Sequence, residues 1–334
     1  MLLFNWVEFS MSWGTGLTWQ LAQQRAAVLK KIRTFFAKRN VVEVETPLMS
    51  KGTVTDVHLD AFSTRYNFSI ASDTDTKEMY LQTSPEFAMK RLLASGYGCI
   101  YQICKAFRHE PYGRHHNPEF TMLEWYRVGY DHFDLMKEVA DLLQQVLACQ
   151  KPVQKTYQEL FKQYVGLDPL VAKKSQLLEY ISRHGKLSDW LMAEDSIDIL
   201  LQFILSEFIE PKIALDRPYF IYNFPRSQAS LAKLCTKDNR VAERFECYYL
   251  GVELANGFNE LTDAKEQVSR FKQDNRDRKS RGLPQRAIDK NFVSALEQGL
   301  PDCAGVALGV DRLLMLACNA GHIDEVLSFP IERS

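Results

Sequence analysis

The sequence has no long apolar run, no internal repeat and no low-complexity tract. A helix that spans a bilayer needs roughly 20 predominantly apolar residues, and no stretch of the sequence approaches that length. The N-terminal segment also lacks the basic leader and the long uninterrupted apolar core of a signal peptide. We therefore expect a soluble, cytoplasmic protein without a membrane anchor.

The sequence also lacks an excess of charge of either sign. Lysine and arginine total 41, aspartate and glutamate total 42, and the formal net charge is -1. A general polyanion-binding protein takes its affinity from a basic surface that neutralises phosphates. The balanced composition argues against a general polyanion-binding protein, although it still allows a local basic patch.

Cysteine chemistry is poorly represented as well. The seven cysteines are scattered and odd in number, and none belongs to a CxxC pair. This pattern favours neither a disulfide framework nor a zinc site, and it is typical of a reducing compartment. The composition, with 46% hydrophobic and 25% charged residues, is that of an ordinary globular protein large enough to bury a sizeable core.

The residues that indicate a ligand site are concentrated in one stretch, residues 101–130, with the sequence YQICKAFRHEPYGRHHNPEFTMLEWYRVGY. Apolar and polar residues alternate on both sides of a loop that contains Pro111, Gly113 and Pro118, which predicts an antiparallel hairpin. Ionisable residues cluster where the strands meet the loop. Because a buried charge costs several kcal/mol unless it is paired, we expect a ligand to supply an anion for the arginines and a cation for the carboxylates.

Two further segments precede this hairpin. Helical periodicity from Thr18 to Asn40 predicts an amphipathic helix, and the strand VVEVETP follows it and ends at Pro47. The segment LQTSPEFAMKRLLASG predicts a strand, a turn and a helix. Pro85 and Glu86 fall in the first helical turn, where the missing donor of proline costs nothing and the helix dipole favours a carboxylate. By themselves these residues indicate only a capped helix.

Residues 240–260 predict a second hairpin, with Gly251 near its turn. Glu253 and Glu260 are seven residues apart with Gly257 between them, so a strand bent by a bulge could aim both carboxylates at one point. Two carboxylates beside phosphates are the expected arrangement for magnesium bound with ATP. The alternative is a pair of exposed strand glutamates.

The remaining segments define the domain layout. Residues 151–210 predict an inserted helical region, because residues 175–181 and 197–208 have helical periodicity. A charged helix at 260–282 ends in basic residues, which favours a solvated face that complements the helix dipole. These basic residues are Arg276, Arg278, Lys279 and Arg281. We predict an N-terminal extension at 1–17 and one catalytic domain at 18–334 that contains the insertion at about 151–210.

The ordered segments FRHE, RHHNPEF and TMLEWY resemble motif 2 of the class II aminoacyl-tRNA synthetases, specifically the lysine branch. The helix and strand at 18–47 resemble motif 1, and GVELANGFNEL resembles a strand of the lysyl enzymes. The glycine-rich strand from Gly305 to Gly309 and the helix opened by Asp311 and Arg312 resemble motif 3. This resemblance implies an α+β fold, a class II synthetase-like catalytic core whose mostly antiparallel β-sheet is flanked by helices. Motif 1 further implies a homodimer.

The resemblance also implies an ATP-dependent ligase. A substrate carboxylate attacks the α-phosphate of ATP and gives an aminoacyl-adenylate and pyrophosphate, so no side-chain nucleophile is needed. Positioning and neutralisation of developing charge supply the acceleration. Several carboxylates in a pocket that must also admit ATP fit a cationic, lysine-like substrate.

By the same resemblance, Arg108 and Arg312 have the catalytic roles: Arg108 binds the α-phosphate and the substrate carboxylate, and Arg312 encloses the adenine together with Phe120. Glu110 and Asn117 read the purine edge, and His115 or His116 holds the distal phosphate. The implied ATP site is Arg108, His109, Glu110, His115, His116, Asn117, Phe120, Glu253, Leu254, Gly309 and Arg312. The implied amino-acid site is Ser84, Pro85, Glu86, Glu124, Tyr126, Glu260 and Ala307, and the implied magnesium ligands are Glu253 and Glu260.

The acceptor is inferred from what surrounds the motifs. Motif 1 begins almost at residue 18 and no domain follows motif 3, so we expect no anticodon-binding domain and no tRNA binding. Such a core resembles the lysyl-tRNA synthetase paralogues that attach (R)-β-lysine to a lysine of translation elongation factor P, as do RHHNPEFTMLEWYR and SQASLA. The alternatives are a truncated lysyl-tRNA synthetase that charges tRNA(Lys), an amide-forming synthetase of the mini asparagine type, and a non-catalytic paralogue that senses amino acid or RNA.

Two positions depart from the pattern of the tRNA-charging lysyl enzymes. Those enzymes typically have Glu-x-Ser-Pro where this chain has Ser227, Gln228 and Ala229. They usually have glycine where GVALGVDR has Ala307. The extra methyl group would crowd the α-amino group of lysine and tolerate an amine one carbon further along. The alternative is that Ala307 only packs within its strand.

Overall fold

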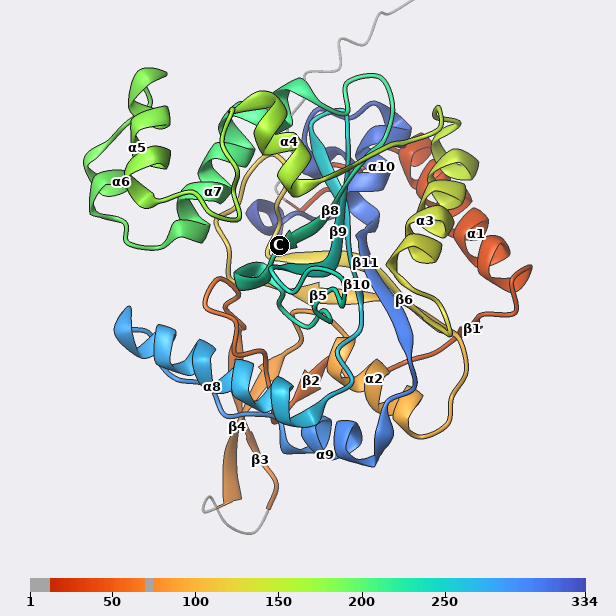
Figure 1. Cartoon of the computed structure of the whole chain (residues 1–334). Helices are drawn as coiled ribbons and strands as arrows, with labels where there is room; N and C mark the ends of the chain where they lie inside the picture. The colour runs from red at the N-terminus through yellow and green to blue at the C-terminus, as the bar shows by residue number, and fades with distance from the viewer. Residues whose placement is uncertain (1–12, 70–74) are drawn as a thin grey trace, which may run out of the picture.

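The structure is a computed structural model, and it describes residues 13–69 and 75–334 (Figure 1). Residues 1–12 of the predicted N-terminal extension lie outside the described residues. The rest of that segment leads into α1 (Trp19–Ala37), and the Thr15 hydroxyl donates to the carbonyl of Ser328 at 2.6 Å. The two ends of the described chain therefore lie together.

An eight-stranded sheet of order β1-β5-β6-β11-β10-β9-β8-β7 forms the centre of the molecule. Neighbouring strands pair antiparallel, except for the parallel pairs β1–β5 and β7–β8. The predicted hairpins are confirmed as β5–β6 and β9–β10, and so is the predicted mostly antiparallel α+β fold. The strands are β1 (Val42–Glu43), β5 (Ile100–Phe107), β6 (Glu119–Val128), β7 (Val153–Thr156), β8 (Tyr219–Pro225), β9 (Val241–Tyr249), β10 (Val252–Asn259) and β11 (Cys303–Gly309).

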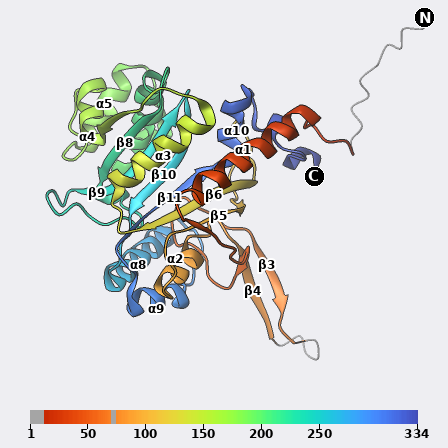
Figure 2. The same cartoon turned by 90° about the vertical axis from the view of Figure 1, so that its right-hand side faces the viewer.

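One face of this sheet is covered by α1, α3 (His132–Leu147) and α10 (Val310–Cys318) (Figure 2). Because side chains alternate between the two faces of a strand, Leu123, Phe220 and Leu308 all point into this helical layer and are fully buried. The packing closes this face of the sheet to ligands. Polar residues of the same strands therefore gather on the opposite face.

A second group of helices lies at one end of the sheet: α2 (Glu86–Ala94), α8 (Ala264–Ser280) and α9 (Lys290–Gly299). Beside them is a three-stranded sheet of order β2-β4-β3, in which β3 (Ser63–Asn67) and β4 (Thr76–Leu81) project from the body and β2 is Met49–Ser50 (Figure 1). The predicted solvated face at the end of α8 is wrong for Arg278, which is 1% exposed. Its guanidinium donates to the carbonyls of Pro284 and Asp56 at 2.7 and 2.9 Å. Arg278 therefore ties α8 to these two loop segments instead of facing solvent.

The predicted insertion is mostly helical and packs around its own apolar core against β8. It begins with strand β7, which extends the edge of the main sheet, so the segment is not helical throughout. Its helices are α4 (Tyr157–Tyr164), α5 (Lys174–Arg183), α6 (Asp189–Ala193), α7 (Ile197–Ile204), the π-helical turn η2 (Leu205–Ile209) and the 3-10 turn η3 (Glu210–Lys212). The other 3-10 turns are η4 (Arg226–Gln228), η5 (Ile323–Val326) and η6 (Ile331–Arg333).

Candidate active site

The face of the sheet opposite the helical layer carries two adjoining cavities. The larger has a volume of about 2050 Å³ and contains most of the predicted amino-acid site: Ser84, Glu86, Glu124, Tyr126 and Glu260. The smaller has a volume of about 120 Å³ and contains most of the predicted ATP site: Glu110, His115, His116, Asn117, Phe120, Leu254, Gly309 and Arg312. Both cavities are lined by Arg108, Glu253, Asn256 and Ala307, so they are two ends of one site.

The strand register explains why these residues meet. Glu124 of β6 pairs with Ala307 of β11, which pairs with Asn256 of β10, which in turn pairs with Glu246 of β9. Directly paired residues place their side chains on the same face of a sheet. These four residues therefore form a row across the centre of the site, with Ala307 between a carboxylate and an amide.

A β-bulge brings the two predicted metal ligands to the same face. Glu253 and Glu260 are seven positions apart, and an odd spacing would place them on opposite faces of a regular strand. The register of β10 against β9 shifts between Glu253 and Ala255, and the extra residue restores the same-face arrangement. Both glutamates line the larger cavity, as the sequence pattern predicted.

The amino-acid end of the site is a network of buried side chains. Glu124 accepts hydrogen bonds from the Ser84 and Tyr126 hydroxyls, each at 2.7 Å. Lys90 Nζ lies 2.6 Å from Glu86 Oε1 and 2.5 Å from Glu260 Oε2. The sequence interpretation did not include Lys90, although its position one turn after Glu86 on α2 is the spacing of a helical ion pair.

The charges in this network shift one another's proton affinities. Burial and the neighbouring Glu86 charge raise the pKa of Glu124 to about 7. Burial alone would lower the pKa of Lys90, but the charges of Glu260 and Glu86 outweigh it and raise that pKa. Lys90 therefore stays protonated, while Glu124 can gain or lose a proton near neutral pH.

Gly305 provides the space in which two of these side chains fit. A Cβ atom at this position would lie 2.3 Å from the Tyr126 ring and 2.4 Å from Glu260 Oε1, both far inside van der Waals contact. Because β11 lies between β6 and β10, any larger residue would push Tyr126 and Glu260 out of the pocket. The glycine-rich pattern was noted in the sequence, but only the register shows which glycine the pocket requires.

The nucleotide end is cationic. Arg108 Nε donates to the carbonyl of Thr83 at 3.3 Å, and the guanidinium carbon lies 5.3 Å from the centre of the Phe120 ring. Arg312 donates to the carbonyls of His115 and Glu253 at 3.2 and 3.0 Å. The two predicted catalytic arginines thus flank the smaller cavity, both anchored by backbone carbonyls.

The histidines of the motif 2 loop stay neutral beside these arginines. Burial and the neighbouring arginine charges lower the pKa of His115 and of His116. His116 Nε2 lies 2.8 Å from Arg312 Nη2, a distance at which a neutral ring nitrogen accepts a hydrogen bond from the guanidinium.

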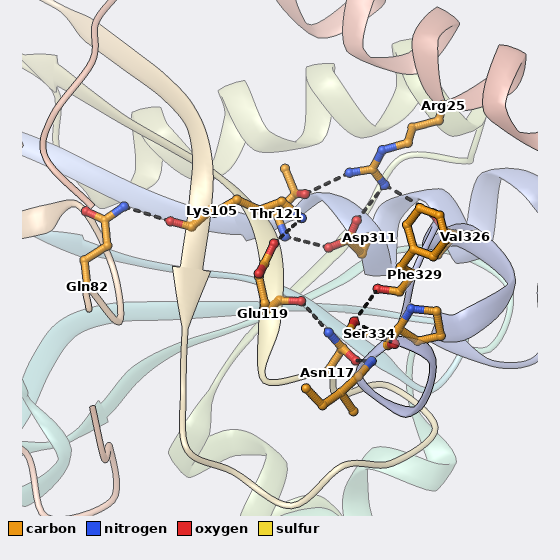
Figure 3. A network of polar contacts seen from close by, with 12 residues as sticks. Arg25, Gln82, Lys105, Asn117, Glu119, Thr121, Asp311, Val326, Phe329 and Ser334 are labelled. Atoms are coloured by element: carbon orange, nitrogen blue, oxygen red, sulfur yellow. Dashed lines mark hydrogen bonds and ion pairs between the residues drawn. The ribbon is translucent and has the colours of Figure 1, made fainter. Parts of the chain in front are cut away.

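Asp311 fixes the start of α10, from which Arg312 projects. Its carboxylate accepts from the backbone amide of Thr121 and from Arg25 Nη1, both at 2.6 Å. Arg25 Nη2 also donates to the Thr121 hydroxyl at 2.8 Å, so α1, β6 and α10 are joined at one point (Figure 3). This contact makes the position of Arg312 depend on α1.

Two predicted site residues have polar contacts outside the site, and a third, Pro85, lines neither cavity. The Asn117 side chain donates to the carbonyl of Glu119 at 2.6 Å and accepts from the amide of Ile331 at 2.9 Å, so its role in reading the purine stays a prediction (Figure 3). His109 faces Asp60, with Nδ1 and Oδ2 3.6 Å apart, and lines neither cavity. Pro85 precedes α2 and also lines neither cavity.

A carboxylate that the sequence interpretation missed stands beside Glu253. Burial and the nearby Glu253 charge raise the pKa of Glu246. Burial, together with the charges of Glu246 and Glu253, raises the pKa of Glu210 to about 7. Among the described residues, no group of three or more His, Cys, Asp or Glu has the arrangement of a metal site. Magnesium, however, commonly takes one or two carboxylates together with substrate phosphates. Glu253 fits that donor set, whereas Glu260 faces Lys90 and Glu246 faces Arg244, so the predicted pair of magnesium ligands, Glu253 and Glu260, stays a prediction.

The fold and the site define the catalytic domain of a class II synthetase, and the model of the family "tRNA synthetases class II (D, K and N)" matches residues 17–333. A protein of Salmonella gallinarum named "Elongation factor P--(R)-beta-lysine ligase" is 56% identical over 311 residues, which cover 93% of this chain and 95% of that protein. A protein of the same name from Salmonella paratyphi B is 55% identical over the same shares. The chain therefore belongs to the family of elongation factor P (R)-β-lysine ligases within the class II tRNA synthetases.

Within the described residues, no helix is both long enough and apolar enough to cross a membrane. All seven cysteines are free thiols in the structure.

Proposed function

We propose that this chain activates (R)-β-lysine with ATP and transfers it to a lysine side chain of translation elongation factor P. The relatives carry this activity in their names, and the charge of the pocket is the structural observation that supports it. Three carboxylates, Glu86, Glu124 and Glu260, surround one ammonium group, that of Lys90.

When these groups are ionised, the pocket has two negative charges in excess. A diamino acid brings two ammonium groups to balance them, and its single carboxylate can face Arg108, which lines the same cavity. An amino acid with one amine would leave a buried carboxylate without a partner, at a cost of several kcal/mol. The charge balance thus favours a lysine-like substrate over a neutral one.

In the activation step, an oxygen of the β-lysine carboxylate attacks the α-phosphorus of ATP, and the bond to the bridging oxygen of pyrophosphate breaks. Arg108 offsets the charge of the substrate carboxylate and of the α-phosphate, while Arg312 and Phe120 enclose the adenine. Magnesium, if held by Glu253 together with the phosphates, would supply further neutralisation of phosphate charge. These roles explain why both cavities share Arg108 and Glu253.

In the transfer step, the neutral amine of the acceptor lysine attacks the carbonyl carbon of the adenylate. A C–N bond forms, the C–O bond to AMP breaks, and the proton lost by the amine is released. The larger cavity exceeds the 300–1,000 Å³ of common small-molecule sites, so it has room for both the adenylate and a protein side chain.

We further propose a cytoplasmic homodimer. Trp19 on α1 is 76% exposed and Val42 on β1 is 61% exposed, and both lie in the segment that resembles motif 1. Large apolar side chains on an exposed edge strand are typical of a subunit interface. Light scattering on the purified chain tests this, with Val42→Asp expected to give monomers.

The decisive experiment incubates the chain with ATP, (R)-β-lysine and elongation factor P and weighs the factor by mass spectrometry. We expect a gain of one lysyl unit on one lysine, lost when ATP is omitted. Parallel reactions with tRNA(Lys) distinguish the alternative of a truncated tRNA synthetase. Charging of tRNA without modification of the factor would overturn the proposal.

A further inference from the structure

The helical insertion touches the catalytic sheet through an acidic residue that the proposed reaction does not use. Asp198 stands in the first turn of α7, where Ser196 caps the helix and the dipole stabilises a carboxylate. Its Oδ1 accepts from the Ser227 hydroxyl at 2.7 Å and from Gln228 Nε2 at 3.0 Å. Asp198 therefore ties the insertion to η4, the turn that follows β8.

A second set of contacts continues from η4 to the sheet. Arg244 Nη1 donates to the carbonyl of Gln228 at 2.7 Å, and Arg244 Nη2 donates to Glu246 Oε1. The guanidinium also lies 4.6 Å from the centre of the Phe224 ring, at the end of β8. Arg244 is thus held by a backbone carbonyl, an aromatic ring and a carboxylate, and its side chain is only 17% exposed.

Glu246 is the carboxylate that this series of contacts positions. Its second oxygen accepts from the Tyr248 hydroxyl at 2.6 Å, so both oxygens have fixed partners. Glu246 faces the like charge of Glu253, and repulsion would turn the two side chains apart unless Arg244 held Glu246 in place. Displacement of the Gln228 carbonyl would remove one of the supports of Arg244.

We propose that Asp198 is a positioning residue that acts through Gln228 and Arg244 on Glu246, which lines the larger cavity beside Glu253, a residue that both cavities share. This inference rests on the proposed ATP-dependent activation. The inference gives the helical insertion a role in the reaction in addition to packing. Through Asp198, the insertion contacts η4 and so sets the geometry of Glu246 in the neighbouring sheet.

The test compares Asp198→Ala and Glu246→Gln with the double variant, and Glu179→Gln, an exposed acid on α5, is the matched control. We expect Asp198→Ala to weaken ATP binding, measured by calorimetry without amino acid, by about fivefold to tenfold, the equivalent of one typical hydrogen bond. The KM for ATP should rise by the same factor, while the KM for β-lysine changes less than twofold. Glu179→Gln should leave all three values unchanged.

The double variant separates positioning from a general loss of stability. If Asp198 acts through Glu246, Asp198→Ala adds no further loss of ATP binding when Glu246→Gln is already present. Additive losses, or equal changes in both KM values, would overturn the proposal. Should Asp198→Ala not fold, Ser227→Ala and Gln228→Ala each remove one of the two hydrogen bonds and take its place. Because ATP binding is measured directly, failure of the transfer reaction would not be confused with failure of this inference.

Discussion

The two ends of the site are built in different ways. At the amino-acid end, acidic and basic side chains contact one another and are almost completely buried: the side chains of Lys90 and Glu260 are each 1% exposed. At the nucleotide end, the arginines are held by backbone carbonyls, and the side chains of Arg312 and Glu253 are 23% and 39% exposed. The first end is assembled before any ligand arrives, whereas the second has looser ion pairs, Arg312 with Glu253 and Arg108 with Glu110 at 3.7 and 4.0 Å, whose charges stay accessible to phosphates.

This difference separates specificity from reactivity. Buried groups that already have partners cannot adapt, so a substrate with the wrong number of charges leaves a buried group unpaired. Partly exposed arginines adapt to a flexible triphosphate and act where charge develops. The following predictions test whether the two ends differ in this way, beginning with the largest expected effect.

Replacement of Arg108, which lines both cavities, should have the largest effect on the reaction. Arg108→Ala removes the positive charge shared by the α-phosphate and the substrate carboxylate, and we expect ATP–pyrophosphate exchange to fall by about 10³-fold. The unfolding temperature should stay near that of the unchanged protein. Arg183→Ala, at an exposed position of α5, is the control, and a loss of less than threefold for Arg108→Ala would contradict the proposed role.

Replacement of Lys90 should affect stability rather than reactivity alone. Lys90→Met leaves Glu86 and Glu260 as buried like charges, which should cost about 3–5 kcal/mol in the free energy of unfolding. The control is Lys105→Met, because Lys105 and its partner Glu119 are 41% and 52% exposed and such a pair contributes at most about 1 kcal/mol. Urea unfolding measures both. Equal losses for the two variants would show that the acidic network is not pre-assembled.

Binding of β-lysine should depend on pH through Glu124. Because the pKa of Glu124 is raised to about 7, the carboxyl is protonated below that pH and must lose its proton to pair with an ammonium group. Affinity for β-lysine should therefore fall as pH decreases below 7, by up to about tenfold per unit. Calorimetry in buffers of different ionisation enthalpy measures the released proton. In Glu124→Gln the part of the dependence centred near pH 7 should disappear and leave only that of Glu260, whose pKa is raised to about 8 by burial and the neighbouring carboxylates; an unchanged pH profile would contradict the role of Glu124.

The smallest expected effect concerns Ala307, which lies between Glu124 and Asn256 at the centre of the site. Ala307→Gly removes one methyl group from the pocket wall and should improve the use of α-lysine relative to β-lysine by about tenfold. Pyrophosphate exchange with each isomer measures the preference. No change in preference would mean that Ala307 only packs within β11.

Several features of the fold and site could be read directly from the sequence. The alternation of residues 101–130 and 240–260 predicted the hairpins that form β5–β6 and β9–β10, because strand alternation is a local property. The spacing of Glu253 and Glu260 indicated a bulge, and the structure contains one. Arg108, Glu124 and Arg312 stand out in the sequence because each lies in a motif or a predicted strand, where an ionisable side chain needs a partner.

Other features depended on pairings between distant segments. Nothing near Lys90 in the sequence indicates that it meets Glu260, which is 170 residues away and reaches it through a different strand. Arg278 belongs to a run of basic residues that resembles a solvated face, yet the chain folded beneath α8 buries it. Glu246 is only seven positions from Glu253, but it lies on β9, and its place beside Glu253 depends on how β9 pairs with β10.

The sequence by itself determined the class of chemistry. Its arginines, glutamates and glycines occur in a characteristic order, and local periodicity already places them on strands and at the starts of helices. Only the tertiary structure decided the charge balance of the pocket and which acids serve each end. The physical reason is that pairing and burial arise from strand register, which brings together residues far apart in the chain and sets the proton affinity of each group through its neighbours.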